Sequence, residues 1–170
     1  MADNIILIGF MGVGKGRTAR ALAALTGRFT VDTDDLIESM VKMKVRHIFA
    51  AQGEAHFRQL EQRTADWLEA QVRGTIVSTG GGFFKVSNLR QIGKTIYLHS
   101  TLEDILTAMR CSPAAEKRIK KRPLLQDLTQ AEKMFAERLP QYRQTANIEI
   151  AVPGRKTAGI ASEIAPLPLQ

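Results

Sequence analysis

The chain has 170 residues, and its 24 Lys and Arg outnumber its 17 Asp and Glu to give a formal net charge of +7. Hydrophobic residues make up 44% and charged residues 24% of it, a composition that excludes a disordered or collagen-like chain. No apolar run approaches the roughly 18 residues of a membrane-spanning helix. No basic stretch precedes the first short apolar run, so the sequence does not indicate a secretory signal. The lone cysteine, Cys111, excludes an internal disulfide. We therefore expect a single cytoplasmic domain over residues 1–170, with no membrane partner.

The positive charge has two interpretations, a nucleic-acid partner or small anions bound by arginines. Aromatic residues make up only 6% of the chain, and it contains no zinc-ligand spacing or RNA-recognition signature. The histidines His47, His56 and His99 stand apart from one another, which favours solvated or structural roles over metal binding. The choice between the two interpretations therefore depends on the motifs.

Short apolar runs alternate with longer amphipathic segments, which is the pattern of a parallel sheet covered by helices. Several runs are apolar at consecutive positions, as expected for strands buried on both faces. The predicted strands are Asn4–Ile8, Phe29–Val31, Thr75–Ser78, Thr95–Leu98 and Asn147–Val152. The predicted helices are Lys15–Leu25, Asp34–Met43, Glu54–Gln71, Thr101–Arg110, Thr129–Ala146 and Thr157–Ile164. This pattern predicts an α/β fold of three layers, α/β/α, around a five-stranded parallel sheet.

Three further expectations concern the helices. Capping-box spacing occurs at Ser100 with Glu103 and at Thr129 with Glu132. One stripe of the helix over 54–71 is expected to face the core, namely Phe57, Leu60, Thr64, Trp67 and Leu68. Pro140 is expected to kink or break the helix that contains it, because proline lacks an amide donor.

The first predicted strand leads into the sequence GFMGVGKG over residues 9–16, followed at once by a helix rich in Ala and Leu. This is the G-x-x-x-x-G-K frame of a phosphate-binding loop in the strand–turn–helix context that it requires. Glycines let backbone amides turn toward phosphate oxygens, the helix N-terminus adds partial positive charge, and Lys15 can bridge the β- and γ-phosphates. A glycine-rich turn that binds nothing is the less favoured alternative. The frame normally ends in Ser or Thr, and here that position is Gly16.

Two carboxylates, Asp32 and Asp34, follow the second predicted strand. Because open α/β sheets bind ligands at the carboxyl ends of their strands, both should emerge on one side, beside the phosphate loop. One can face a magnesium shell while the other accepts a proton from a substrate hydroxyl. The alternative carries equal weight: Asp34 caps the next helix, and Asp35 and Glu38 complement its dipole.

Arg58 lies between two carboxylates on one predicted helical face, since Glu54, Arg58 and Glu61 are spaced i, i+4 and i+7. Such an arginine is either part of a surface ion-pair ladder or a guanidinium held in place for a substrate carboxylate. The spacing alone favours the surface ladder.

Later segments also indicate an anionic ligand. Three consecutive glycines, Gly80–Gly82, follow the third predicted strand and favour close approach of the backbone to a ligand over a plain flexible turn. The segment Glu116–Arg122 carries five positive charges and one negative charge. It is a lid over a triphosphate, a solvated face or a nucleic-acid patch, and its place between two predicted helices favours the lid. Arg138 stands just before Pro140.

Taken in order, these motifs resemble those of shikimate kinases, small P-loop proteins related to nucleoside monophosphate kinases. The resemblance runs from Ile5 to about Arg155 and rests on GFMGVGK, the D-x-D of Asp32 and Asp34, IF followed by GExxFRxxE, TGGG, RPLL and RxPxY. It implies ATP-dependent phosphorylation of the 3-hydroxyl of shikimate, with Mg²⁺, in aromatic amino-acid biosynthesis. The expected partners are shikimate and ATP, with no nucleic acid, and the expected state is a monomer. The resemblance divides the kinase domain into a phosphate loop over 9–16, a substrate-binding helical region over about 33–62 and a lid over about 111–125.

The resemblance also implies a role for each matching residue. Catalytic roles fall to Lys15, to Asp34 as the base that orients and deprotonates the hydroxyl, and to the lid arginine Arg122. Nucleotide binding falls to Gly12, Val13, Gly14, Lys15, Gly16, Arg17, Arg110, Arg122 and Arg155. Shikimate contacts fall to Asp34, Phe49, Phe57, Arg58, Gly80, Gly81, Gly82 and Arg138, in which the two arginines grip the carboxylate and Glu61 holds Arg58. Asp32 is implied to touch the water shell of magnesium.

The main departure from the family pattern is Gly16, followed by Arg17 where a hydroxyl-bearing residue is usual. A direct magnesium ligand is therefore missing, and Thr18 cannot replace it because it points to a different side of the helix. Adenylate kinases of the same superfamily carry GKG at this point and remain active, because phosphates and water hold the metal there.

Two other function classes compete with an active kinase. Gly16 motivates a catalytically weakened regulator that binds nucleotide or shikimate, but a pure binder needs neither Asp34 as a base nor Arg122 in a lid. The segment 116–122 motivates a nucleic-acid-binding module, but the chain offers no aromatic platform for it. A gluconate or nucleotide acceptor does not explain two carboxylate-gripping arginines together with three glycines.

Overall fold

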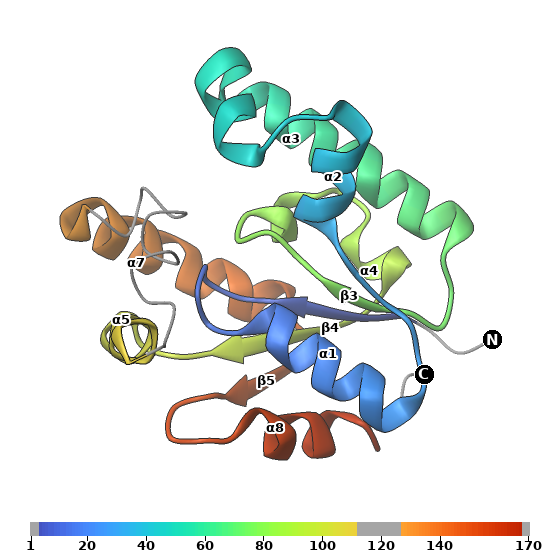
Figure 1. The fold of residues 1–170 in the computed structure, drawn as a ribbon, viewed down its shortest axis with the longest axis vertical. Coiled ribbons are helices and arrows are strands. Elements are labelled where there is room, and N and C mark those ends of the chain that lie inside the picture. The colour runs from blue at the N-terminus through green and yellow to red at the C-terminus, as the bar shows by residue number, and fades with distance from the viewer. Residues whose placement is uncertain (1–3, 112–126, 168–170) are drawn as a thin grey trace.

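The computed structural model describes residues 4–111 and 127–167. In these residues, five parallel strands form one sheet in the order β2-β3-β1-β4-β5. The strands are β1 (Asn4–Ile8), β2 (Thr30–Asp32), β3 (Ile76–Ser78), β4 (Gly93–His99) and β5 (Ile148–Ala151). The register pairs Ile6 of β1 with Val77 of β3 and with Thr95 of β4. Because β1 lies in the middle, the loop that follows it emerges at the centre of the sheet's carboxyl edge (Figure 1).

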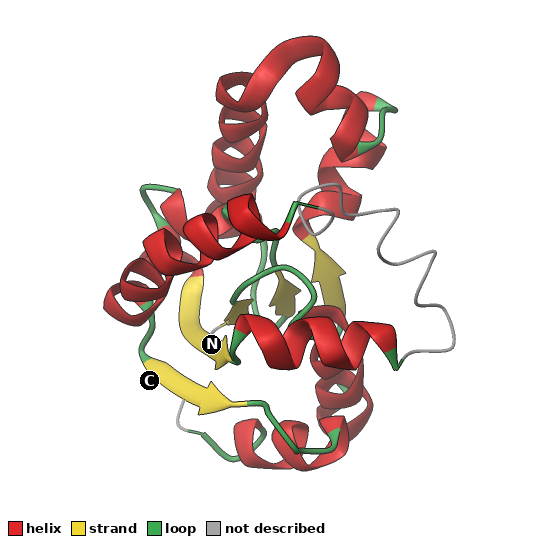
Figure 2. Cartoon of the chain, turned by 90° about the vertical axis from the view of Figure 1, so that its left-hand side faces the viewer, coloured by secondary structure: helices red, strands yellow, loops and turns green. Residues whose placement is uncertain are grey.

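Helices lie on both sides of the sheet, which gives the three layers that the sequence predicts (Figure 2). They are α1 (Lys15–Thr26), α2 (Thr33–Val41), α3 (Val45–Gln71), the 3₁₀ helix η1 (Phe83–Lys85), α4 (Leu89–Ile92), α5 (Leu102–Arg110), α7 (Leu128–Thr145) and α8 (Thr157–Ile164). Helices α1 and α8 pack against each other on one face, while α4 and α7 contact β4 from the other (Figure 1). In the described ranges, no helix is long and apolar enough to cross a membrane. The predicted α/β class with a five-stranded parallel sheet is confirmed.

Strand β1 is buried along its whole length because helices cover both faces of the sheet. Its first residue, Asn4, is polar and yet fully buried. The Asn4 side chain donates to the carbonyls of Val72 (2.8 Å) and Ile92 (2.9 Å) and accepts from the amide of Thr75 (3.0 Å). These three bonds satisfy the buried amide, and they fasten the amino end of the central strand to the segments that precede β3 and β4.

Helix α3 differs from the prediction in where it begins and in what it buries. It begins at Val45, well before the predicted start, and bends at Gly53, whose backbone is not helical (φ 79°, ψ 174°). Trp67 is 45% exposed and does not belong to the core. At about 100° per residue, Trp67 lies at the edge of the buried stripe, whereas Glu61 and Ala65 lie within it. The other stripe residues, Phe57, Leu60, Thr64 and Leu68, are buried as predicted.

Two helix starts and one expected break also differ. The observed N-caps are Thr101 rather than Ser100 for α5, and Asp127 rather than Thr129 for α7. Helix α7 runs through Pro140 as one helix, so the predicted break does not occur. Pro140 lies at an exposed position. Water can therefore donate to the helix carbonyl one turn earlier, which has no amide donor from proline.

Candidate active site

A cavity of about 810 Å³ opens where the loops after β1, β2 and β3 meet. Its walls come from these loops and from α2, α3 and α7. All eight residues predicted to contact the substrate line it, namely Asp34, Phe49, Phe57, Arg58, Gly80, Gly81, Gly82 and Arg138. Asp32, the predicted metal-side residue, lines it as well. The fold thus brings residues that are far apart in the sequence to one place at the carboxyl edge of the sheet.

The loop between β1 and α1 has the backbone of a phosphate-binding loop. Gly9, Gly12 and Gly14 have φ angles of 146°, 85° and 107°, which residues with side chains rarely adopt. Lys15 begins α1 and is buried, and its Nζ donates to the carbonyls of Gly9 (2.7 Å) and Phe10 (3.1 Å). The ammonium group therefore lies over a loop whose amides and following helix N-terminus favour an anion.

Asp32 ends β2 and caps α2. Its Oδ1 accepts from the amides of Asp34 (3.0 Å) and Asp35 (3.5 Å), and its Oδ2 accepts from the hydroxyl of Ser78 (2.7 Å). Capping by Asp34 was the alternative that the sequence left open, and it is wrong. The two aspartates do not share one extended segment either, because Asp34 lies in the first turn of α2. Since Asp32 satisfies the helix, the Asp34 carboxylate is available to the cavity.

The Asp34 carboxylate is held in a position that disfavours its charge. Its Oδ1 is buried and has no hydrogen-bond partner among the described residues. It lies so close to the backbone of Gly80 that a Cβ on Gly80 would stand 2.5 Å from it. Burial, together with the negative charges of Asp32 and Glu61, raises the pKa of Asp34 to about 7, although Lys15 lowers it. A carboxylate with such a pKa is suited to accept a proton near neutral pH.

Arg58 is held between two carboxylates, as its spacing predicts. Its Nε and Nη2 donate to Glu54 Oε1 (3.1 Å and 2.8 Å), and its Nη1 pairs with Glu61. The interpretation as a surface ion-pair ladder is nevertheless wrong for the pair of Arg58 with Glu61, because Glu61 is only 1% exposed. Burial raises the pKa of Glu61, and the positive charge of Arg58 opposes that rise. The guanidinium also lies against Gly82, where a Cβ would collide with Nη1.

Arg138 reaches the same glycine loop from α7. It is 7% exposed, and its Nη1 donates to the carbonyl of Gly81 at 3.0 Å. The loop Gly80–Gly82 thus has the carboxylate of Asp34 at its first glycine and guanidinium groups at its second and third. Two fixed positive charges in one cavity, near a carboxylate of raised pKa, fit a ligand that carries both a carboxylate and a hydroxyl group.

An apolar wall completes the cavity. The rings of Phe49 and Phe57 lie 4.7 Å apart between centroids, and the guanidinium carbon of Arg58 lies 5.7 Å from the centre of the Phe57 ring. Phe57 is buried, whereas Phe49 is partly open to solvent. Together they offer an apolar surface to the body of a small ligand.

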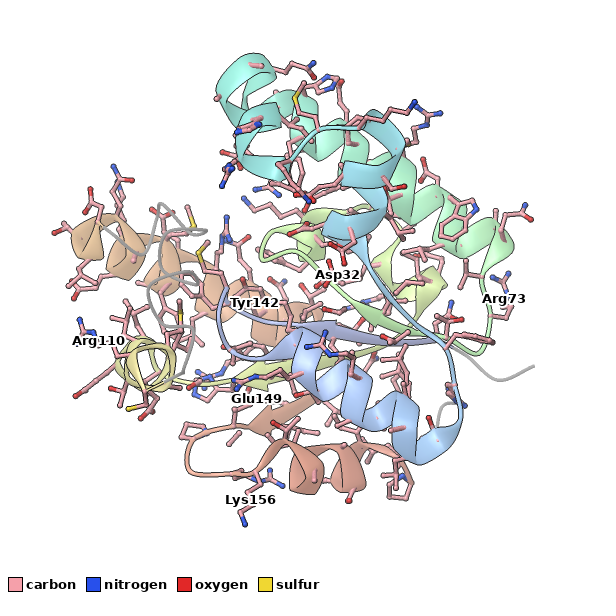
Figure 3. The ribbon with its side chains drawn as sticks, viewed as in Figure 1. Asp32, Arg73, Arg110, Tyr142, Glu149 and Lys156 are labelled. Carbon is pink, nitrogen blue, oxygen red and sulfur yellow. The ribbon has the colours of Figure 1, made fainter. Side chains whose placement is uncertain are left out.

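The arginines predicted on the nucleotide side do not gather at this cavity. Arg110 is exposed at the end of α5, well apart from Asp32 in Figure 3. Arg155 pairs with Glu163 on α8 and donates to the carbonyl of Ala151 (3.1 Å). Neither is among the described residues that line the cavity. Arg122 and the rest of the predicted lid over 112–125 lie outside the described residues.

The position of Gly16 has room for a side chain. A Cβ there would stand 3.5 Å from a guanidinium nitrogen of Arg20 and 3.8 Å from the Ser78 hydroxyl, which is ordinary contact. Next to it, Arg17 is exposed and its guanidinium lies beside the backbone of Gly14, while the side chain of Val13 belongs to the hydrophobic core. The oxygens of Asp32 and Ser78 near this position are of the kind that Mg²⁺ prefers.

Sequence reasoning did not single out several residues that shape the site. Ser78 holds Asp32, Thr33 accepts from the amide of Gly80 (3.0 Å), and Tyr142 donates to the carbonyl of Gly81 (2.5 Å). Ser78 ends a predicted strand and Tyr142 belongs to the RxPxY motif, so position and motif were the available signals. Their partners come from other elements, and spacing along the chain does not reveal such pairs.

The fold and the cavity define a class, the P-loop phosphotransferases, in which a nucleotide phosphate lies on the loop after β1 and an acceptor lies beside it. The sequence model of the family described as shikimate kinase matches residues 11–167. The chain therefore belongs to the shikimate kinase family. It is a kinase that uses ATP, and its acceptor is an alcohol.

Individual relatives agree with this assignment. A shikimate kinase of Helicobacter hepaticus is 35% identical over 142 residues, which cover 84% of this chain and 82% of that protein. A shikimate kinase of Chromobacterium violaceum is 37% identical over 157 residues, covering 88% of this chain and 81% of that protein. The structure of the shikimate kinase of Acinetobacter baumannii in complex with shikimate superposes with a TM-score of 0.83 at 30% identity, covering 96% of this chain and 91% of that one.

The raised pKa of Asp34 makes a prediction about stability. Between about pH 4 and about pH 7 the folded chain binds a proton at Asp34 that the unfolded chain does not, so this group lowers the stability of the fold as the pH rises. Asp34→Asn removes that loss and should raise the free energy of unfolding at pH 8 by on the order of 2–4 kcal/mol. Urea unfolding at pH 8 and at pH 4.5 measures the difference.

The gain should fall to about 1 kcal/mol or less at pH 4.5, because that pH is close to the pKa of an unfolded aspartate and little stability has yet been lost there. Asp35→Asn is the matched control, since Asp35 is the exposed neighbour on the same helix turn, and it should show a much smaller change. An equal stabilisation by Asp34→Asn at both pH values would show that Asp34 carries no buried charge.

Proposed function

We propose that this chain transfers the γ-phosphoryl group of ATP to the 3-hydroxyl of shikimate, with Mg²⁺, giving shikimate 3-phosphate and ADP. The observation that carries the proposal is the content of one cavity: a carboxylate with a pKa of about 7 together with two arginines, beside a phosphate loop. A hydroxy acid such as shikimate would use both parts of this cavity, the arginines for its carboxylate and the Asp34 carboxylate for its hydroxyl. We further propose that the chain acts as a cytoplasmic monomer, as expected from its sequence.

Arg58 and Arg138 bind the carboxylate of shikimate in this proposal. Glu54 and Glu61 hold the guanidinium of Arg58, so little rotamer freedom is lost when the anion arrives. The carbon ring of the substrate rests against Phe49 and Phe57. The backbone of Gly80–Gly82 closes the remaining side, since this loop contacts both arginines and Asp34.

Asp34 accepts the proton of the 3-hydroxyl as that oxygen attacks the γ-phosphorus. The new O–P bond forms while the bond to the β–γ bridging oxygen breaks, and ADP leaves with the electron pair. Lys15 stabilises the charge that develops on the β- and γ-phosphates, and Arg122 is proposed to reach the transferring group from the lid. Arg17, Arg110 and Arg155 stay as proposed nucleotide contacts.

Asp32 and Ser78 are the residues proposed to hold Mg²⁺ through its water shell. When bound, the ion neutralises charge on the β- and γ-phosphates. Because Asp32 and Ser78 would reach the ion only through water, phosphates and water would supply its roughly six direct ligands. This arrangement requires no side chain at position 16, which favours an active kinase over a weakened regulator.

ADP release with MgATP, measured with and without shikimate, tests the proposal directly. A shikimate-dependent rate is expected. Release that is slow and independent of shikimate, despite binding of both ligands, favours the weakened regulator, whereas binding of single-stranded nucleic acid without kinase activity favours the nucleic-acid module.

Removing either carboxylate-gripping arginine should weaken shikimate binding selectively. Arg58→Ala and Arg138→Ala each remove a charge-assisted hydrogen bond, so the KM for shikimate should rise at least about tenfold while ADP binding is nearly unchanged. Arg143→Ala, on the same helix as Arg138 but exposed and paired with Glu149, is the control and should change neither. Equal loss of shikimate and ADP affinity in both cavity variants would show that these arginines are structural.

Gly16→Ser should lower the magnesium concentration at half-maximal rate, because a hydroxyl at this position adds an oxygen beside Asp32 and Ser78. Both Gly16→Ser and the control Gly16→Ala replace a glycine in a helix and should stabilise the fold by about 0.5–1 kcal/mol. Only the serine variant should shift the magnesium titration of the initial rate. Identical titration curves for all three proteins would mean that the loop holds its metal without any contribution from position 16.

A further inference from the structure

Tyr142 shares a hydrogen-bond acceptor with Arg138. The hydroxyl of Tyr142 donates to the carbonyl oxygen of Gly81 at 2.5 Å, and Nη1 of Arg138 donates to the same oxygen at 3.0 Å. The two residues lie one turn apart on α7, so both reach the glycine loop from the same helical face. The sequence motif that contains them assigned a role to Arg138 and none to Tyr142.

The ring of Tyr142 is fixed on both sides. It stacks on Tyr97 of β4, with centroids 5.1 Å apart and an interplanar angle of 19°, and it meets Phe84 of η1 edge to face at 4.6 Å. Tyr142 is 1% exposed and lies on the part of α7 toward the centre of the molecule (Figure 3). Burial raises the pKa of its hydroxyl to about 12, although Arg138 lowers it, so the proton stays on the oxygen at neutral pH. The hydroxyl is therefore a donor in a fixed place.

This donor determines the orientation of one peptide group in the site. A carbonyl oxygen has two lone pairs, and at Gly81 both are used by α7. Because the peptide bond is trans, the amide of Gly82 points away from α7. Arg138 also makes a side-chain hydrogen bond with the Tyr142 hydroxyl, so the tyrosine contacts both the guanidinium and the carbonyl that this guanidinium binds.

We propose that Tyr142 is a positioning residue for the acceptor: through the carbonyl of Gly81 it holds Arg138 and the glycine loop in the orientation that binds the substrate carboxylate. The inference rests on the proposed function, because it concerns how the same cavity binds shikimate. It predicts a binding effect of one hydroxyl group that never touches the substrate.

Tyr97 provides a matched control within the same aromatic stack. Its ring packs on Tyr142, it is also 1% exposed, and its hydroxyl bonds to Nδ1 of His99 at 3.0 Å, away from the glycine loop. Tyr142→Phe and Tyr97→Phe therefore make the same chemical change in neighbouring buried rings. Only the first removes a hydrogen bond to Gly81.

The experiment compares both variants with the natural protein by calorimetric titration of shikimate and of ADP, and by steady-state kinetics. Tyr142→Phe should raise the Kd and the KM for shikimate about 3- to 10-fold, as expected for one lost hydrogen bond, with kcat and the Kd of ADP within about twofold. Tyr97→Phe should leave all four quantities within about twofold. A second comparison adds Arg138→Ala, in whose background Tyr142→Phe should change shikimate affinity by less than about twofold, because the residue that Tyr142 positions is gone.

Several results would overturn the inference. They are an unchanged shikimate affinity in Tyr142→Phe, an equal loss in Tyr97→Phe, and a full effect of Tyr142→Phe when Arg138 is absent. A Tyr142→Phe protein that no longer binds ADP would place Tyr142 in folding rather than in positioning, and would overturn it too. If the natural protein itself binds no shikimate, the proposed function fails, and this outcome is distinct from any difference between variants.

Discussion

A buried carboxylate that must still be able to carry a charge is the constraint around which this site is built. Within the described residues, Asp34 Oδ1 has no hydrogen-bond partner, and the surroundings raise the pKa of Asp34 from 3.8 to about 7. Such a group lowers the stability of the fold at neutral pH. Two neighbouring residues make its position possible. Asp32 takes over the capping of α2, and Gly80 leaves room for the carboxylate where any Cβ would collide.

The glycine loop after β3 connects this carboxylate to the positive side of the cavity. Arg58 arrives from α3 and Arg138 from α7, and both guanidinium groups lie against the loop. The buried Glu61 sets the position of the first arginine, while the Gly81 carbonyl sets that of the second. The substrate side is thus built from three elements that only the sheet topology brings together, which explains why a rigid α/β scaffold suits it.

The sequence predicts the fold class and most of the cavity, for physical reasons that can be named. Consecutive apolar residues in 4–8 indicate a doubly covered strand, and the functional motifs follow strand ends, where an α/β sheet places its ligand sites. The predictions failed where long-range contacts decide. Spacing predicted that Arg58 lies between two carboxylates but could not show that Glu61 is buried. Periodicity predicted that Trp67 belongs to the core, but Trp67 is exposed at its edge. The pairs Ser78–Asp32 and Tyr142–Gly81 join residues that no local pattern links.

The central claim is that Asp34 is a base whose pKa has been raised toward neutrality by burial and by neighbouring negative charge. The most direct measurement is kcat/KM for shikimate against pH, with ATP well below saturation so that the profile reports the free enzyme. The account predicts that kcat/KM rises about tenfold per pH unit on the acidic side and levels off above about pH 7. A profile that is flat from about pH 5.5 to about pH 8.5, in a protein that stays folded across that range, would contradict it.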